Sequence, residues 1–412
     1  MVSWVAGVKA DKRFFGDIGD HLATVQERWR TYNPYLVALV IFGSSRLVVA
    51  WAMFIAAPYP PNDIPEAAQF DAGSSWYRYL LRWDSAWYAT ILNEGYKYNG
   101  NDSVFQSVNF WPLYPLTAKA LTIVSGIDGL LALVVVANVA AILCVLLLFK
   151  YVRQSYGDEC AWLTIACLSF FPTSLFLSAG YTESLTLLLI LCCFLLLERE
   201  QYIVAAVFAG LASATRSTGI VLMPVIIWEL WCKFAGDYRR FFSYAMFCSI
   251  LATSGLWLYM VYLWSAFDSP FAFATVRKGG IGHNFISALL LKGFFPLPLP
   301  VLHKLPIPPI PESLDVWFFL LFLTLILVHR KWLSSSLYLF ALAVLMLPYL
   351  TVTGGPVGFK GMTRFILLAF PVFIVMAKLC KNRLWLVPCI TGLFAGMLFA
   401  YSVLYVRWYW VE

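Results

Sequence analysis

The chain has 412 residues, of which 61% are hydrophobic and only 12% are charged. Soluble domains carry about 25% charged residues, so this chain has too little polar surface to cover a water-soluble globule of its size. The formal net charge of +7 is spread in short clusters between apolar runs, which excludes a nucleic-acid-binding surface and is typical of a membrane protein. The composition therefore predicts an all-α polytopic membrane protein.

Residues 1–33 are polar and mixed in charge, and they lack the short apolar core and cleavage site of a secretory signal. We therefore expect a cytoplasmic N-terminal segment over 1–33, followed by a retained first membrane span. Residues 34–412 are predicted to form a single transmembrane domain.

Eleven apolar runs could cross a bilayer, although several are shorter than the roughly 20 residues that a crossing helix needs. The predicted spans are 34–57, 129–149, 160–178, 183–198, 202–218, 219–233, 243–265, 314–329, 335–352, 364–379 and 384–405. With the N-terminus inside, every inner loop carries Lys or Arg, as the positive-inside rule requires.

That orientation holds only if the run 110–126 does not cross the membrane. This run contains two prolines and Lys119, which favour an interfacial or re-entrant helix. The outer side then holds a first large loop with interfacial helices over 58–128 and a second large loop over 266–313.

The segment 74–95 predicts an amphipathic helix that lies along the membrane surface. Its apolar face would carry Trp76, Leu80, Trp83, Trp87 and Ile91, and its polar face would carry Arg78 and Arg82.

Asp84 interrupts the apolar face of this predicted helix. A carboxylate in partly dry surroundings suits a general base. The alternative is that Asp84 pairs with Arg82, or begins a helix because the segment is two helices broken near it. The sequence leaves both interpretations open.

Other charged residues also fall at the outer face. Glu183 follows Tyr181 at the start of a span, where the helix dipole alone would favour an acid. Arg216 lies between two apolar runs and could simply extend toward the interface. A lipid phosphate would explain the remaining outer cations, which the positive-inside rule disfavours there: Arg277, Lys278, Lys360 and Arg364. Arg46 lies in the middle of the first span, and the sequence gives it no role.

Several motifs resemble the PIG-V family of membrane mannosyltransferases. They are RWDSAWYATILNEGY at 82–96, NFWPLYPL at 109–116, YTES at 181–184, ATRSTG at 214–219 and TRFILLAFPVF at 363–373. They occur in the family's order. Two departures are Ser85-Ala86-Trp87, where many members carry a polar residue, and Phe110-Trp111 in place of Phe-Phe.

The resemblance implies the GT-C glycosyltransferase architecture and an inverting reaction at the extracytoplasmic or lumenal face of a plasma or endoplasmic-reticulum membrane. The expected donor is a polyprenyl- or dolichyl-phosphate sugar, with mannose as the expected sugar, and the expected acceptor is a glycolipid or glycan, as in GPI-anchor biosynthesis. The family's catalytic Asp maps onto Asp84. The predicted substrate-binding residues are Trp83, Tyr181, Glu183, Arg216, Arg277, Lys278 and Arg364.

The nine cysteines and four histidines show no disulfide framework and no metal-ligand spacing. The sequence therefore predicts no resident cofactor. Several GT-C relatives use a divalent metal, so the resemblance leaves a metal open.

Three rival functions remain. A transporter or lipid flippase also needs many spans, but it places its polar groups near the bilayer midplane, whereas these gather at one face. A scaffold with a decayed site is a second rival, since fold does not guarantee activity. The third is a GT-C enzyme that uses another polyprenyl-phosphate sugar.

Overall fold

A computed structural model describes residues 32–61, 75–281, 311–352, 361–381 and 383–411. Every regular element in these ranges is a helix, which confirms the predicted all-α class. Most of the expected N-terminal segment 1–33 and much of the second outer loop 266–313 lie outside the described residues.

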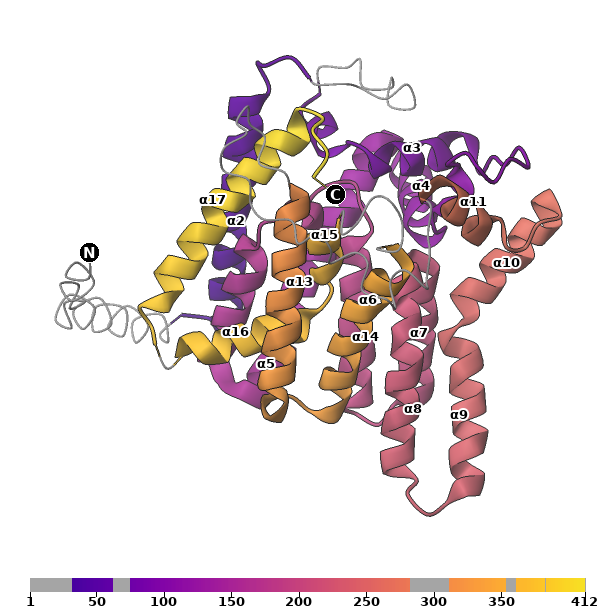
Figure 1. Ribbon diagram of the computed structural model, residues 1–412, viewed down its shortest axis with the longest axis vertical. Helices are drawn as coiled ribbons and strands as arrows, with labels where there is room; N and C mark the ends of the chain where they lie inside the picture. Colours follow the sequence, from indigo (N-terminus) through magenta and orange to yellow (C-terminus); the bar gives the residue numbers. More distant parts are fainter. Residues whose placement is uncertain (1–31, 62–74, 282–310, 353–360, 382, 412) are drawn as a thin grey trace, which may run out of the picture.

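Apolar helices stand beside one another and form the body of the molecule (Figure 1). They are α2 (Pro34–Ala56), α5 (Gly129–Phe170), α6 (Glu183–Leu197), α7 (Tyr202–Thr215), α8 (Leu222–Lys233), α9 (Tyr238–Ala252), α10 (Ser254–Phe267), α13 (Pro311–Val328), α14 (Ser335–Val352), α16 (Phe370–Lys381) and α17 (Leu386–Val406).

Shorter helices gather toward the upper end in the view of Figure 1 or link the long ones. They are η2 (Trp76–Leu80), α3 (Asp84–Glu94), η3 (Ser107–Asn109), α4 (Leu113–Ser125), η4 (Ser174–Leu177), η5 (Ser217–Val221), α11 (Ala272–Ile281), η7 (Arg330–Trp332) and α15 (Met362–Ile366). Helix α4 has 13 residues. Its length of about 20 Å is less than the hydrocarbon thickness, and its interfacial or re-entrant placement stays a prediction.

Three described helices, α2, α5 and α17, are long and apolar enough to cross a membrane. The pair α9 and α10, bent by 50°, would make a fourth. Four shorter apolar helices, in α6, α7, α13 and α14, have 10–17 residues. The count of about eleven spans therefore stays a prediction.

The boundaries of three predicted spans were wrong. The span 160–178 ends as a helix at Phe170, because Pro172 disfavours a helical conformation at Phe171. The span 364–379 is divided into α15 and α16, and Pro371 lies in the first turn of α16, where proline is tolerated. The span 243–265 is divided at Thr253.

The prediction of one continuous helix over 74–95 was also wrong. The chain forms η2, leaves helical geometry at residues 81–83 and begins α3 at Asp84. Arg82 is buried at 3% exposure and does not lie on a polar face. The break arises because backbone groups here bond across the fold: the N–H of Gly180 donates to the Leu80 carbonyl at 2.9 Å, and the Tyr181 hydroxyl donates to the Arg82 carbonyl at 2.9 Å.

Arg46 on α2 holds the irregular segment that follows α5. Its guanidinium donates to the carbonyls of Ser174 and Ser169 at 2.7 and 3.0 Å, and to the hydroxyls of Ser174 and Ser178 at 2.8 and 3.1 Å. A cation in an apolar span is costly unless its donors are satisfied. Arg46 thereby fixes the chain that leads to Tyr181 and Glu183.

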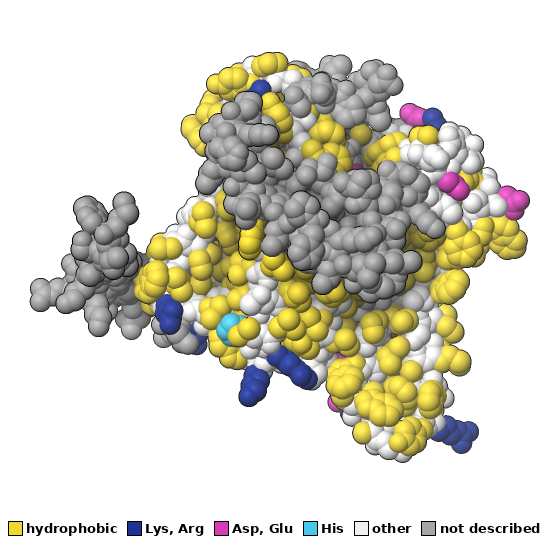
Figure 2. Space-filling model, in the orientation of Figure 1, with side chains coloured by type: hydrophobic (Ala, Val, Ile, Leu, Met, Phe, Trp, Pro, Cys, Tyr) yellow, Lys and Arg dark blue, Asp and Glu magenta, His cyan; other side chains and the backbone are white. Residues whose placement is uncertain are grey.

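Basic side chains lie along the lower edge of the molecule in Figure 2, and acidic side chains show at its upper right. The loops at the lower end include the α8–α9 turn with Lys233, Arg239 and Arg240, and the α13–α14 turn with Arg330 and Lys331 (Figure 1). The two ends of the helix body therefore differ in charge.

We expect Arg46→Met to lower the free energy of unfolding by about 2–4 kcal/mol, because it leaves several buried oxygens without a donor. The measurement is the thermal unfolding temperature in detergent. Arg240→Met is the matched control, because the Arg240 side chain is 72% exposed and pairs with Asp237 at the surface. Equal unfolding temperatures for the two variants would contradict the role given to Arg46.

Candidate active site

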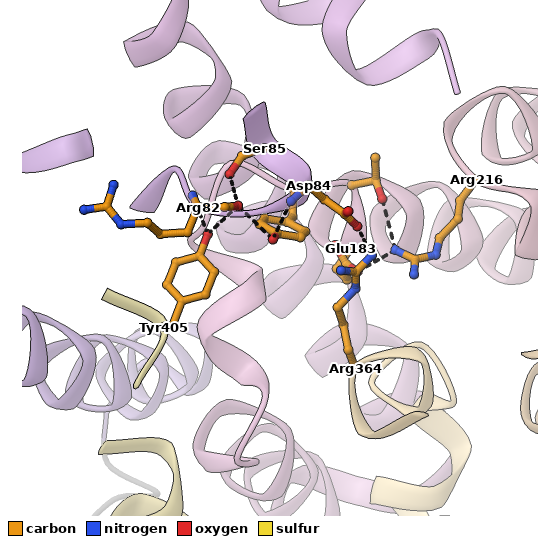
Figure 3. Close-up of polar contacts among 9 residues, drawn as sticks. Arg82, Asp84, Ser85, Glu183, Arg216, Arg364 and Tyr405 are labelled. Atoms are coloured by element: carbon orange, nitrogen blue, oxygen red, sulfur yellow. Dashed lines mark hydrogen bonds and ion pairs between the residues drawn. The ribbon is translucent and has the colours of Figure 1, made fainter. Parts of the chain in front are cut away.

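Four charged side chains from distant parts of the sequence meet in one network (Figure 3). Asp84 begins α3, Glu183 begins α6, Arg216 follows α7 and Arg364 lies on α15. All four were predicted site residues, and the structure brings them together as alternating acids and bases.

Arg364 is the centre of this network. Its Nη2 lies 2.9 Å from Oδ2 of Asp84, and its Nε lies 2.8 Å from Oε1 of Glu183. One planar guanidinium therefore holds two carboxylates in a fixed relation, which a flexible ammonium group could not do as well.

Glu183 is shared between two arginines. Its Oε1 also pairs with Nη1 of Arg216, and the same Nη1 donates a hydrogen bond to the Thr182 hydroxyl at 3.1 Å. The Glu183 side chain has no exposed surface, and its Oε2 has no hydrogen-bond partner among the described residues. A buried carboxylate needs such cationic partners to stay ionised.

Aromatic rings line the two guanidinium groups. The Arg364 guanidinium carbon lies 4.9 Å from the centroid of Tyr181 and 5.4 Å from that of Phe176. The Arg216 guanidinium lies 4.7 Å from the centroid of Phe365. Ring faces stabilise cations in dry surroundings, so they help to hold both arginines in place.

The four side chains differ in access from outside. The Asp84 side chain is 22% exposed, whereas those of Arg364 and Arg216 are 8% and 9% exposed and that of Glu183 is fully buried. Asp84 is therefore the acid that an incoming molecule can reach, and Glu183 lies behind it.

The backbone at Asp84 is fixed by Tyr181. The Tyr181 hydroxyl accepts a hydrogen bond from the Asp84 N–H at 3.2 Å while it donates to the Arg82 carbonyl. Tyr181 itself is fully buried. Of the interpretations left open by the sequence, Asp84 does begin a helix, but its carboxylate pairs with Arg364 and not with Arg82.

Gly180 packs closely against the Leu81 side chain beside Asp84. A Cβ at this position would lie 2.4 Å from Cδ2 of Leu81, which is far closer than real side-chain carbons pack. A larger residue at this position would therefore require the Leu81 side chain to move, whereas the nearest backbone atom, the Leu80 carbonyl oxygen, would lie at an ordinary contact distance of 3.7 Å.

Asp315 supports Arg364, and sequence reasoning missed it. This buried carboxylate on α13 accepts the N–H groups of Gly361 and Thr363 at 3.0 and 2.7 Å, as well as the Thr363 hydroxyl. It thereby caps the start of α15 from a neighbouring helix. The signal was an acid inside an apolar run, which usually marks a functional or structural partner.

The remaining predicted site residues lie apart from the network or beyond what can be described. Trp83 precedes Asp84 and directs its indole N–H to the Tyr409 carbonyl at 3.1 Å. Arg277 and Lys278 belong to α11, but their side chains lie outside the described part of the structure, as does Lys360.

The donor set of this site does not fit a divalent cation. Both carboxylates of the network already face guanidinium groups, which would repel a metal ion. Within the described ranges, no group of three or more His, Cys, Asp or Glu residues could hold a metal. We therefore derive no step through a metal ion.

Comparison with known proteins shows the family to which this chain belongs. The profile of the mannosyltransferase (PIG-V) family matches residues 59–273, which is just over half of the chain. The chain belongs to the PIG-V mannosyltransferase family. The matched region contains Asp84, Glu183 and Arg216, whereas Arg364 and Asp315 lie beyond it.

Two curated relatives are the GPI mannosyltransferase 2 proteins of two strains of Cryptococcus neoformans var. neoformans serotype D. Each is 32% identical over 152 residues, which is 34% of this chain and 34% of the relative. The alignment thus spans about a third of the length of these relatives.

Solved structures with a similar arrangement include the oligosaccharyltransferase of Archaeoglobus fulgidus. In its apo form it is 12% identical, with a TM-score of 0.45 over 91% of this chain and 56% of the other. In complex with an inhibitory peptide and a dolichol-phosphate it is 11% identical, with a TM-score of 0.45 over 92% of this chain and 56% of the other. Scores at this level do not establish a common fold.

We expect Asp315→Asn to loosen residues 361–366, because the amide nitrogen cannot accept the N–H bonds that the carboxylate accepts. Each lost charge-assisted bond is worth about 1.5–3 kcal/mol. Hydrogen exchange of this segment in nanodiscs should rise at least tenfold. The control is Glu229→Gln, which alters a carboxylate that binds the Ser336 hydroxyl at the start of α14. Unchanged exchange at 361–366 in Asp315→Asn would refute the capping role.

Proposed function

We propose that this protein is an inverting mannosyltransferase that moves mannose from a polyprenyl- or dolichyl-phosphate donor to a glycolipid or glycan acceptor. The observation that carries the proposal is one partly exposed carboxylate, Asp84, at the edge of a buried network with two arginines. Family membership supplies the class of reaction, and the network supplies groups suited to it.

Asp84 would act as the general base. In the proposed step the acceptor hydroxyl oxygen bonds to the anomeric carbon, its proton passes to Asp84, and the bond from that carbon to the donor phosphate breaks with its electron pair on phosphate. Arg364 keeps the Asp84 carboxylate oriented. Burial, and then the negative charge of Asp84, raises the pKa of the nearby Tyr88 phenol, so this group stays protonated and is a poor alternative base.

Arg364 and Arg216 would stabilise the leaving phosphate. A lipid phosphate is a stable anion and needs no strong general acid, but it needs fixed cations in dry surroundings. Both guanidinium groups are nearly buried and are lined by aromatic rings, which meets that requirement. Glu183 would orient the two arginines or bind a sugar hydroxyl.

The proposed sidedness is extracytoplasmic or lumenal. The site lies at the end of the helix body opposite to the basic turns between α8 and α9 and between α13 and α14 (Figure 1, Figure 2). Basic loops favour the cytoplasmic side. A transporter would instead place such charges near the midplane, so the position of the network favours an enzyme at the membrane surface.

We expect Asp84→Asn to lower mannose transfer by about 10²–10⁴-fold, because a general base contributes that much to the rate. Purified protein would be assayed with polyprenyl-phosphate mannose and total host lipids. The control is Glu94→Gln, since Glu94 lies at the other end of α3 and pairs with Lys97 at the surface. Wild-type transfer by a folded Asp84→Asn variant would overturn the assignment.

We expect Arg364→Lys to lower kcat/KM for the donor about 100-fold, although the positive charge is kept. An ammonium group cannot hold Asp84 and Glu183 in one planar fork. Arg240→Lys, at the opposite end of the molecule, is the control. Full activity of Arg364→Lys would show that charge alone suffices and that the observed geometry is not used.

A further inference from the structure

The segment Tyr405–Val411 begins in the last turn of α17 and continues beyond it. It lies against the backbone just before Asp84. The Tyr405 hydroxyl accepts a hydrogen bond from the Arg82 N–H at 3.1 Å (Figure 3). The same hydroxyl donates to the Leu80 carbonyl at 3.2 Å. The Val406 carbonyl accepts from Nε of Arg82 at 3.2 Å. Two segments more than 300 residues apart are thus joined through backbone groups.

Aromatic contacts extend this junction. The Trp83 ring packs edge-on against Trp408 and Trp410, with centroids 5.7 and 4.9 Å apart. Trp408 is buried at 1% exposure, contacts Ala86 in the first turn of α3, and places its ring 4.8 Å from the Arg82 guanidinium. Trp83 and Ala86, which lie on either side of Asp84 in the sequence, therefore both pack against Trp408.

Trp83 adopts a backbone conformation that a bulky residue rarely adopts. Its φ of 51° and ψ of −116° lie outside the favoured regions for side chains with a Cβ. Such strain persists only where surrounding contacts hold it. Here the indole N–H of Trp83 donates to the Tyr409 carbonyl, and Tyr405 binds the preceding residue. This conformation ends the 81–83 segment and sets where α3 begins.

We propose that Tyr405–Val411 is a positioning element that locks Trp83 in its strained conformation and so aims the Asp84 carboxylate at Arg364. Tyr405 is its principal positioning residue. The role in aiming Asp84 rests on the proposed transfer reaction. The role in holding Trp83 does not depend on that reaction. Displacement of a catalytic group by about 1 Å can cost 100-fold in rate, so small losses in this junction would reach the chemistry.

The chain offers a matched pair of tyrosines to test this. Tyr401 and Tyr405 are one helical turn apart on α17, and both are buried. The Tyr405 hydroxyl bonds the segment before Asp84, whereas the Tyr401 hydroxyl has no hydrogen-bond partner among the described residues. Each of the variants Tyr405→Phe and Tyr401→Phe therefore removes one buried hydroxyl group. Only the Tyr405 hydroxyl bonds to the segment before Asp84.

The experiment compares the two variants in nanodiscs by thermal unfolding, by hydrogen exchange of residues 81–86 and by steady-state transfer from polyprenyl-phosphate mannose. We expect Tyr405→Phe to stay folded with a slightly lower unfolding temperature, because the buried Arg82 N–H loses its acceptor. Exchange at 81–86 should rise at least tenfold, and kcat should fall roughly ten- to a hundredfold with little change in the donor KM. Tyr401→Phe should match the wild type in all three measurements.

Each outcome bears on one part of the inference. Equal exchange at 81–86 in the two variants would overturn the lock, whatever the activity. Raised exchange in Tyr405→Phe with unchanged kcat would overturn its role in aiming Asp84. If the wild-type protein transfers no mannose, the proposed function fails, but the exchange measurement still decides whether Tyr405–Val411 holds the segment before Asp84.

Discussion

The site depends on one guanidinium group that two carboxylates share. Arg364 reaches Asp84 with one nitrogen and Glu183 with another, so the three elements that carry these residues can meet only in one relative position. A buried charge is costly without close partners, so any other arrangement that left one of these charges unpaired would be less stable. Around it, Asp315 caps the short helix of Arg364, Tyr181 fixes the backbone of Asp84, and Arg46 holds the segment that leads to Glu183.

These supports share a physical cause. Helices leave backbone groups unsatisfied at their ends, and each charged residue of the network lies at or beside a helix end. Side chains from other parts of the fold satisfy the freed groups: the Asp315 carboxylate, the Tyr181 and Tyr405 hydroxyls and the Arg46 guanidinium. The charged residues of the site therefore lie where apolar helices end. The backbone groups left free at these ends form the hydrogen bonds that hold the site in place.

The sequence predicted the participants better than their arrangement. Asp84, Glu183, Arg216 and Arg364 were named because they are charges at the outer face of an apolar chain and lie in motifs that resemble the PIG-V family. Periodicity failed at 74–95, where hydrogen bonds to Gly180 and Tyr181 override an amphipathic helix pattern. Asp315 and Tyr405 could not be assigned, because their partners lie more than 45 and 320 residues away and no local pattern links them.

Charge balance suggests how the resting network could change during the proposed reaction. Two acids and two arginines are neutral together, so the network is stable when no donor is bound. A proton on Asp84 would cancel its charge and weaken its pair with Arg364. At the same moment the lipid phosphate would change from a diester with one negative charge to a monoester that carries between about −1.5 and −2. Arg364 would then gain a new partner as it loses the old one. Uptake of the proton and stabilisation of the leaving group would be coupled through the same guanidinium, because it already touches the base.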